Sequence, residues 1–289
     1  MFEENENLKI AILIDAENIS YKYMATIMKE VAVTGTVKYK RIYGNFASAA
    51  LASWENAIAE NAMIPVQQYS NTKGKNASDS ALIIDAMDLL YTGGVDAFCL
   101  VTSDSDFTRL ATRLRESEKY VFGMGERKTA KSFINACNKF VYLDLLYHQD
   151  MENEKQPEKK KETAPSGRTI KTLKNTAAKK GNDVVAAVNK KQQTPVPTPV
   201  LEEDKDGSGA NVQTIKSAIV ALIDEKSNDE GWVFSGVLGN MLNQRYPDFD
   251  VRNFGFKKFV PFIKSLGNFE IKKTSSGDAD GVDLVYIRN

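Results

Sequence analysis

Acidic residues follow two separate apolar runs of this 289-residue chain. The run Ile10–Ile14 leads directly into Asp15, and the run Ala97–Thr102 is followed by Asp104 and Asp106. Unbroken apolar runs of this length are typical of strands buried on both faces of a parallel sheet. Carboxylates at the same end of two such strands are the oxygen ligands that a hard divalent cation such as Mg²⁺ prefers. The pattern therefore indicates a metal site.

A third segment adds a candidate ligand. Asp79 lies at the predicted start of a helix, and Asn18 follows Asp15 by three residues. Helix N-termini favour negative charge, so each of these aspartates can instead cap a helix or organise a turn. The two interpretations differ in one respect, because a metal site requires all four carboxylates to meet at one edge of the sheet.

Strand-like and helix-like segments alternate in the first half of the chain, from about residue 8 to 147. The predicted strands are Leu8–Ile14, Val37–Tyr43, Ile64–Tyr69, Ala97–Thr102, Tyr120–Met124 and Phe140–Leu143. The predicted helices are Tyr21–Val33, Ala47–Asn61, Ser80–Leu90, Phe107–Glu116 and Ala130–Asn135. This alternation predicts an α/β fold in which a parallel sheet has helices on both faces. Right-handed crossovers place the carboxyl ends of all strands at one edge.

Composition divides the rest of the chain in two. Residues 151–211 lack aromatic side chains, contain several lysine clusters and end in a proline-containing stretch, so they are predicted to be a disordered basic linker. Residues 212–289 show apolar residues at helical spacing in three segments, followed by two strand-like pieces. These features predict a small winged helix-turn-helix domain. The expected domains are thus 1–150, 151–211 and 212–289.

Charge and cysteine content exclude several classes of protein. Lysine plus arginine equals aspartate plus glutamate, at 38 each, so the bulk charge indicates no partner. The two cysteines, Cys99 and Cys137, form no CxxC motif, which excludes a disulfide scaffold and a zinc finger. The acidic N-terminus lacks a secretory pattern, and no apolar run approaches the roughly 20 residues of a membrane span. A cytoplasmic protein without a membrane partner is expected.

The acidic segments resemble a known family. Three blocks, in order, are similar to the three motifs of the NYN domain: Asp15-Ala-Glu-Asn18, Lys75-Asn-Ala-Ser-Asp79 and Thr102-Ser-Asp104-Ser-Asp106-Phe107. The resemblance covers about residues 8 to 147 and implies a PIN-like three-layer α/β/α sandwich. It also implies Mg²⁺ or Mn²⁺ and metal-dependent cleavage of RNA, as expected of an endonuclease.

The same resemblance assigns roles to individual residues. Asp15, Asp79, Asp104 and Asp106 match the catalytic acids that hold the metal, and Asn18 matches a polar catalytic position beside it. Asp85 matches a further acid outside the metal shell. The family usually carries an apolar residue before the mid-chain aspartate, whereas this chain has Ser78.

The C-terminal region resembles the LOTUS, or OST-HTH, domain. The matching segments are Gly231-Trp-Val-Phe-Ser235, Tyr246-Pro-Asp-Phe249 and Phe254-Gly-Phe-Lys257-Lys258-Phe259. The resemblance implies binding of RNA, including structured or G-rich RNA, or of a partner protein. The candidate RNA-binding cations of the chain are Lys75, Arg252, Lys257, Lys258, Lys272 and Lys273. The alternative is that these side chains belong to ordinary solvated faces.

Three functions are compatible with these features. The first is a metal-dependent ribonuclease whose LOTUS domain recruits RNA. The second is a non-catalytic RNA-binding adaptor with a degenerate nuclease fold. The third, a small-molecule phosphohydrolase, is weakened because Glu17, two residues after Asp15, belongs to a different motif. His148 is the only histidine, which argues against a ribonuclease that uses two histidines as acid and base. The sequence leaves the oligomeric state open.

Overall fold

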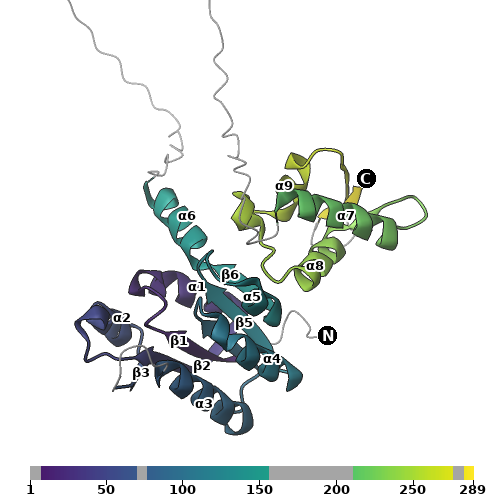
Figure 1. Ribbon diagram of the computed structural model, residues 1–289. Coiled ribbons are helices and arrows are strands. Elements are labelled where there is room, and N and C mark those ends of the chain that lie inside the picture. The colour runs from purple at the N-terminus through teal and green to yellow at the C-terminus, as the bar shows by residue number, and fades with distance from the viewer. Residues whose placement is uncertain (1–7, 70–76, 156–210, 276–282) are drawn as a thin grey trace, which may run out of the picture.

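The computed structural model describes residues 8–69, 77–155, 211–275 and 283–289, which form a larger N-terminal domain and a smaller C-terminal one (Figure 1). Lys75, the linker at 156–210 and the hairpin loop at 276–282 lie outside the described residues. None of the described helices is long and apolar enough to cross a membrane.

A six-stranded parallel sheet forms the centre of the N-terminal domain, as the sequence predicts. Its strands are β1 (Leu8–Asp15), β2 (Gly35–Gly44), β3 (Ile64–Gln67), β4 (Ala97–Val101), β5 (Tyr120–Gly125) and β6 (Lys139–Tyr142). Every neighbouring pair is parallel, and the spatial order is β3-β2-β1-β4-β5-β6.

This strand order places a topological switch point between β1 and β4. The chain first builds the sheet outward through β2 and β3, then returns to the other side of β1 and continues through β5 and β6. Loops leaving β1 and β4 therefore diverge at their carboxyl ends. Open α/β sheets bind their ligands in the crevice at this point.

Helices cover both faces of the sheet. Helices α1 (Met24–Thr34), α2 (Trp54–Glu60) and α6 (Leu143–Lys155) pack on one face, and α3 (Ala77–Thr92), α4 (Thr108–Glu116) and α5 (Lys131–Ala136) pack on the other. Strand β1 alternates between them, because Ile10, Ile12 and Ile14 belong to the first apolar cluster and Ala11 and Leu13 to the second. The three-layer sandwich is thus confirmed.

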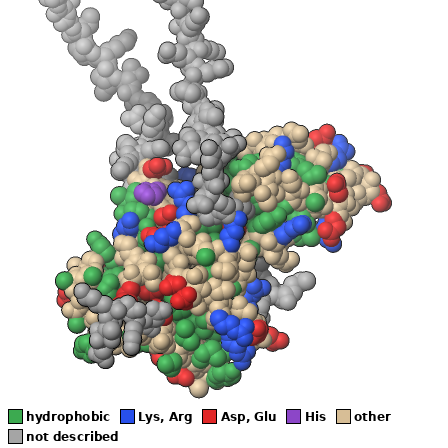
Figure 2. Space-filling model, in the orientation of Figure 1, with side chains coloured by type: hydrophobic (Ala, Val, Ile, Leu, Met, Phe, Trp, Pro, Cys, Tyr) green, Lys and Arg blue, Asp and Glu red, His purple; other side chains and the backbone are tan. Residues whose placement is uncertain are grey.

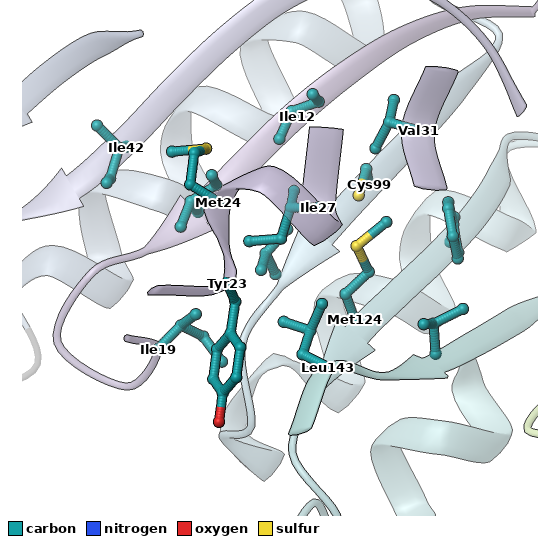
Figure 3. Close-up of a cluster of buried hydrophobic side chains, with 14 of the residues drawn as sticks. Ile12, Ile19, Tyr23, Met24, Ile27, Val31, Ile42, Cys99, Met124 and Leu143 are labelled. Atoms are coloured by element: carbon teal, nitrogen blue, oxygen red, sulfur yellow. The ribbon is translucent and has the colours of Figure 1, made fainter. Parts of the chain in front are cut away.

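Figure 3 shows the first cluster, where Ile27 and Val31 of α1 lie over Ile12 of β1 and Cys99 of β4. Cys99 is fully buried, with no exposed surface, in keeping with the small hydrophobic role of most free cysteines. Complete burial of a side chain the size of Ile12 contributes about 1.5–3 kcal/mol. The apolar runs are therefore sufficient to fix the central strands.

Helix α6 differs from the expectation from sequence. The pattern predicts a strand that ends at Leu143 and a domain that ends at 150, whereas the chain enters a helix at Leu143 that runs to Lys155. Leu143 and Leu146 are buried at helical spacing against α1, but the remaining residues of the helix are mostly polar. A single turn of apolar spacing is too short a signal to distinguish a helix from the end of a strand.

The C-terminal domain combines helices α7 (Val212–Lys226), α8 (Ser235–Arg245) and α9 (Phe259–Ser265) with a three-stranded antiparallel sheet. The sheet has the order β7-β9-β8, formed by Val233–Phe234, Asp283–Arg288 and Glu270–Ser275. Helix α9 begins only at Phe259, because Gly255 has a φ of +80° and ends the short 3-10 helix η4 (Val251–Phe254). Left-handed backbone of this kind terminates helices and favours glycine.

Candidate active site

Asp15 ends β1 with 1% of its surface exposed and accepts hydrogen bonds at both oxygens. Its Oδ1 accepts from the backbone N–H groups of Glu17, at 3.1 Å, and Asn18, at 3.3 Å. Its Oδ2 accepts from Asn18 Nδ2 at 2.6 Å and from Thr102 Oγ1 at 3.0 Å. Burial raises the pKa of Asp15, and these hydrogen bonds oppose the rise. Asp15 therefore organises the turn after β1 and also faces the end of β4.

Thr102 links the two strand ends at the switch point. Its hydroxyl donates to Asp15 and accepts from the backbone N–H of Asp104 at 3.1 Å. Asp104 Oδ1 in turn accepts from the backbone N–H of Asp106 at 2.9 Å, which caps the 3-10 helix η3 (Ser105–Phe107). The capping role considered from sequence is thus present in Asp104. It uses one carboxylate oxygen and leaves the other for a further contact.

Asp79 lies in the first turn of α3 and shows how closely the acids gather. Its pKa is raised from 3.8 to about 6, first by burial and then by the negative charges of Asp15, Asp104, Glu17 and Asp106. Like charges shift a carboxyl pKa in this direction only at short range. On the face that Figure 2 shows, a row of acidic side chains lies on the larger domain, with further acidic side chains elsewhere on its surface. The charges of Asp15, Asp104 and Asp106 thus act on Asp79, although these residues come from three separate segments of the chain.

The donor set consists of carboxylate oxygens only, which fits a hard divalent cation. Within the described residues, however, no three acidic, cysteine or histidine side chains lie close enough together to hold a metal ion. The charges of these acids therefore affect the pKa of Asp79, but the carboxylates are not at the spacing that ligands of one metal ion have. Asp106 is exposed and Asp104 half-buried, so side-chain rotation there can shorten the spacing without moving a strand.

Glu17 is a fifth acid of the site that the sequence analysis did not assign. Its Oε2 accepts from Ser78 Oγ at 2.9 Å, and its Oε1 accepts from the backbone N–H of Asn45 at 3.3 Å. Ser78 is 4% exposed, so this departure from the apolar residue of the family pattern serves to hold Glu17. The position of Glu17 inside the first motif was the one signal in the sequence that it belongs to the site. Its contacts with Ser78 and Asn45 could not be predicted from the sequence.

Asp85 supports the site indirectly. Its Oδ2 accepts from the Tyr43 hydroxyl at 2.9 Å and pairs with Arg41 Nη1 at 2.7 Å, which ties α3 to β2. Tyr43 is the register partner of Asp15, and its carbonyl accepts from the backbone N–H of Ala16. A role for Asp85 outside the metal shell stays a prediction. Asp85 would act on Asp15 through Tyr43 of β2.

The candidate RNA-binding cations fall into separate places. Lys257 and Lys258 are exposed before α9, and Lys272 and Lys273 are exposed on β8. Arg252 differs, since its guanidinium binds the carboxylates of Glu30 and Asp250. We therefore leave Arg252 out of the RNA-binding surface proposed below.

Comparisons with known proteins assign a family to two parts of the chain. Family models match an NYN domain at residues 9–144 and an OST-HTH/LOTUS domain at residues 197–279. A crystal structure of a protein of unknown function from Vibrio parahaemolyticus is 20% identical, covering 49% of this chain and 96% of that one, with a TM-score of 0.41. A search of curated proteins found no match.

Residues 9–144 match the model of the NYN domain, and the six-stranded parallel sheet flanked by helices is consistent with a PIN-like fold. The chain thus carries an NYN domain followed by an OST-HTH/LOTUS domain, and this pair of domains supports an RNA-related nuclease at the family level.

Proposed function

We propose that the protein is a metal-dependent ribonuclease that cleaves RNA internally and recruits it through the LOTUS domain. The observation that supports this most is the Thr102 hydroxyl, which joins the Asp15 carboxylate at the end of β1 to the backbone N–H of Asp104 after β4, at one edge of the sheet. The charges of the neighbouring acids also contribute, after burial, to the raised pKa of Asp79. The edge is the topological switch point, where open α/β folds bind ligands. Repulsion among unneutralised acids is costly, and function is the usual reason for such an arrangement.

Asp15, Asp79, Asp104 and Asp106 are the residues that would hold Mg²⁺ or Mn²⁺. When bound there, the ion supplies a water of lowered pKa and neutralises charge on the phosphate. Asn18 and Thr102 fix the Asp15 carboxylate by donating to its Oδ2. Ser78 holds Glu17 near the same edge by donating to its Oε2.

RNA recruitment is assigned to exposed lysines of the C-terminal domain. Lys257 and Lys258 precede α9, whereas Lys272 and Lys273 lie on β8. Lysines bind phosphate as point charges and release counterions, so we expect affinity to fall as salt is raised. Lys75 is a further proposed contact, from a segment outside the described residues.

The proposal is tested by incubating the full chain with single-stranded RNA, structured RNA and G-rich RNA, and with DNA of the same sequences. Each is tested with Mg²⁺, with Mn²⁺ and with EDTA. We expect internal cleavage of RNA that requires the ion and that EDTA stops. Binding without cleavage across all ions and RNAs would overturn the enzymatic function.

The second candidate, a non-catalytic RNA-binding adaptor, is favoured by one observation. No three described acids stand at the spacing of a metal shell. Under this alternative the chain binds RNA in the same panel, cleaves none of it, and shows no stabilisation by Mn²⁺ in thermal unfolding. A phosphohydrolase would instead release phosphate from small esters and leave RNA intact.

Thr102 offers a prediction about positioning. Thr102→Val removes one of the donors to Asp15 Oδ2 while keeping the side-chain shape, so we expect cleavage to fall about 10–100-fold, as is usual for groups that orient metal ligands. Half-maximal activity should also require more metal, and Thr102→Ser should restore both. The measurement is the cleavage rate as a function of Mn²⁺ concentration.

Thr112→Val is the matched control, since the Thr112 hydroxyl donates only within α4, to the carbonyl of Thr108. Equal loss in both variants, or no rescue by serine, would show that Thr102 contributes to folding and not to the site.

A further inference from the structure

Strand β6 is the last strand of the parallel sheet, and the C-terminal domain contacts it. The backbone N–H of Phe140 in β6 donates to the carbonyl of Pro247 at 2.8 Å, across more than a hundred residues of sequence. An edge strand presents unpaired backbone groups on its outer side. The segment Tyr246–Arg252, which we call the docking segment, therefore pairs with a group that the sheet itself leaves open (Figure 1).

Arg252 makes the most specific contact of the docking segment. Its Nη1 lies 2.6 Å from Glu30 Oε1 and its Nη2 lies 2.8 Å from Glu30 Oε2, in a bidentate pair between α1 and η4. The Asp250 carboxylate accepts hydrogen bonds from Nε and Nη2 of the same guanidinium. These carboxylates raise the pKa of Arg252, and only 6% of Glu30 is exposed. Bidentate arginine pairs combine strength with a fixed geometry.

Two further contacts close the junction. The Tyr142 hydroxyl of β6 donates to Asp248 Oδ2 at 2.9 Å, with both residues buried, and Gln149 Nε2 of α6 donates to the Arg252 carbonyl at 2.5 Å. Burial and the Asp248 carboxylate raise the pKa of Tyr142, so the phenol remains the donor across the accessible pH range. Tyr142, Gln149 and Glu30 of the N-terminal domain each pair with a residue of the docking segment.

We infer that the LOTUS domain docks on the β6 edge of the NYN domain in the intact chain, through the docking segment, so that the two domains move as one body. Paired polar groups give this junction a single register, which a non-specific contact would lack. The covalent connection through residues 156–210 further favours docking by raising the local concentration of one domain around the other. The lysines that precede α9 and those on β8 are thereby held in a fixed relation to the acidic edge.

Arg252→Glu in the full chain tests this inference, because it places a carboxylate against Glu30 and Asp250. We expect amide hydrogen exchange in the peptide that covers Lys139–Tyr142 to speed up at least tenfold, since Phe140 loses its acceptor. Small-angle scattering should show a larger radius of gyration. The paired variant Glu30→Arg with Arg252→Glu should restore both values.

Lys257→Glu is the matched control, because it makes the same charge change on an exposed residue of the same domain, outside the docking segment. It should leave exchange and size as in the unmodified protein. If Arg252→Glu does not fold, Tyr142→Phe replaces it, with a smaller rise in exchange expected from loss of the bond to Asp248. Exchange and size that match the unmodified protein in the folded variant overturn the inference, whether or not the protein cleaves RNA.

Discussion

Asp104→Asn is expected to lower the cleavage rate by about 10²–10³-fold while leaving the fold intact. A divalent ion contributes several kcal/mol of charge stabilisation to phosphoryl cleavage, and each 1.4 kcal/mol or so is a factor of ten in rate. Asparagine keeps the Oδ1 that caps the backbone N–H of Asp106, and it is itself a good cap, so η3 should still form. The substitution thus removes the charge and leaves the local structure.

The measurement is single-turnover cleavage of the best RNA substrate in Mn²⁺, with circular dichroism and the melting temperature as checks on folding. Asp96→Asn is a closely matched control. Asp96 is exposed just before β4, at the opposite end of the strand that Asp104 follows, and accepts the Lys9 backbone N–H. Full activity in Asp96→Asn and loss in Asp104→Asn is the expected pair of results. Unchanged cleavage in Asp104→Asn would exclude this acid from the chemistry.

The larger features of this site were predictable because they depend on burial. The runs Ile10–Ile14 and Ala97–Thr102 are apolar on both faces, so they had to be central strands, and parallel topology then places Asp15 and Asp104 at one edge. The position of Asp79 depended on α3 packing back against the sheet, which it does through Leu82 and its helical neighbours. Hydrophobic periodicity was thus a reliable guide to which segments converge.

Side-chain hydrogen bonds between distant segments were not predictable in the same way. Thr102 with Asp15 and Ser78 with Glu17 each join two motifs, and single polar residues carry no periodic signal. Arg252 is the clearest case, because an arginine in a predicted RNA-binding domain is indistinguishable in sequence from one that pairs with Glu30, over two hundred positions earlier. The partner of a long cation is set by tertiary packing, which local pattern does not encode.

Asp79→Asn should have two effects of opposite sign, a loss of cleavage of about 10–100-fold and a gain in stability of the metal-free protein. The activity falls because a proposed ligand loses its charge. Stability rises because the pKa of Asp79 is raised from 3.8 to about 6 by burial and by neighbouring acids, so the ionised form is unfavourable in the folded state. The helix dipole acts the other way, at about 0.3–1 kcal/mol for an acid in the first turn, so the expected gain in stability is the penalty from burial and neighbouring acids less this amount.

The gain in stability of Asp79→Asn is expected to depend on pH. A carboxyl whose pKa is higher in the folded than in the unfolded state lowers stability above the folded value, near pH 6, and this penalty fades as pH falls toward 3.8. In EDTA, the melting temperature of Asp79→Asn should exceed that of the unmodified protein by a few degrees at pH 7.5. The difference should shrink steadily as the pH is lowered to 4.5.

Asp88→Asn is the control, since Asp88 is exposed further along the same helix and should show no such pH-dependent gain. Mn²⁺ should reverse the order at pH 7.5, because an ion neutralises the acids of the unmodified site and has fewer charges to bind in Asp79→Asn. A gain of equal size at pH 4.5 and pH 7.5 would mean that the amide stabilises α3 locally. A gain confined to neutral pH would mean that the ionised Asp79 carboxylate is unfavourable in the folded protein, because of its burial and of the neighbouring acids.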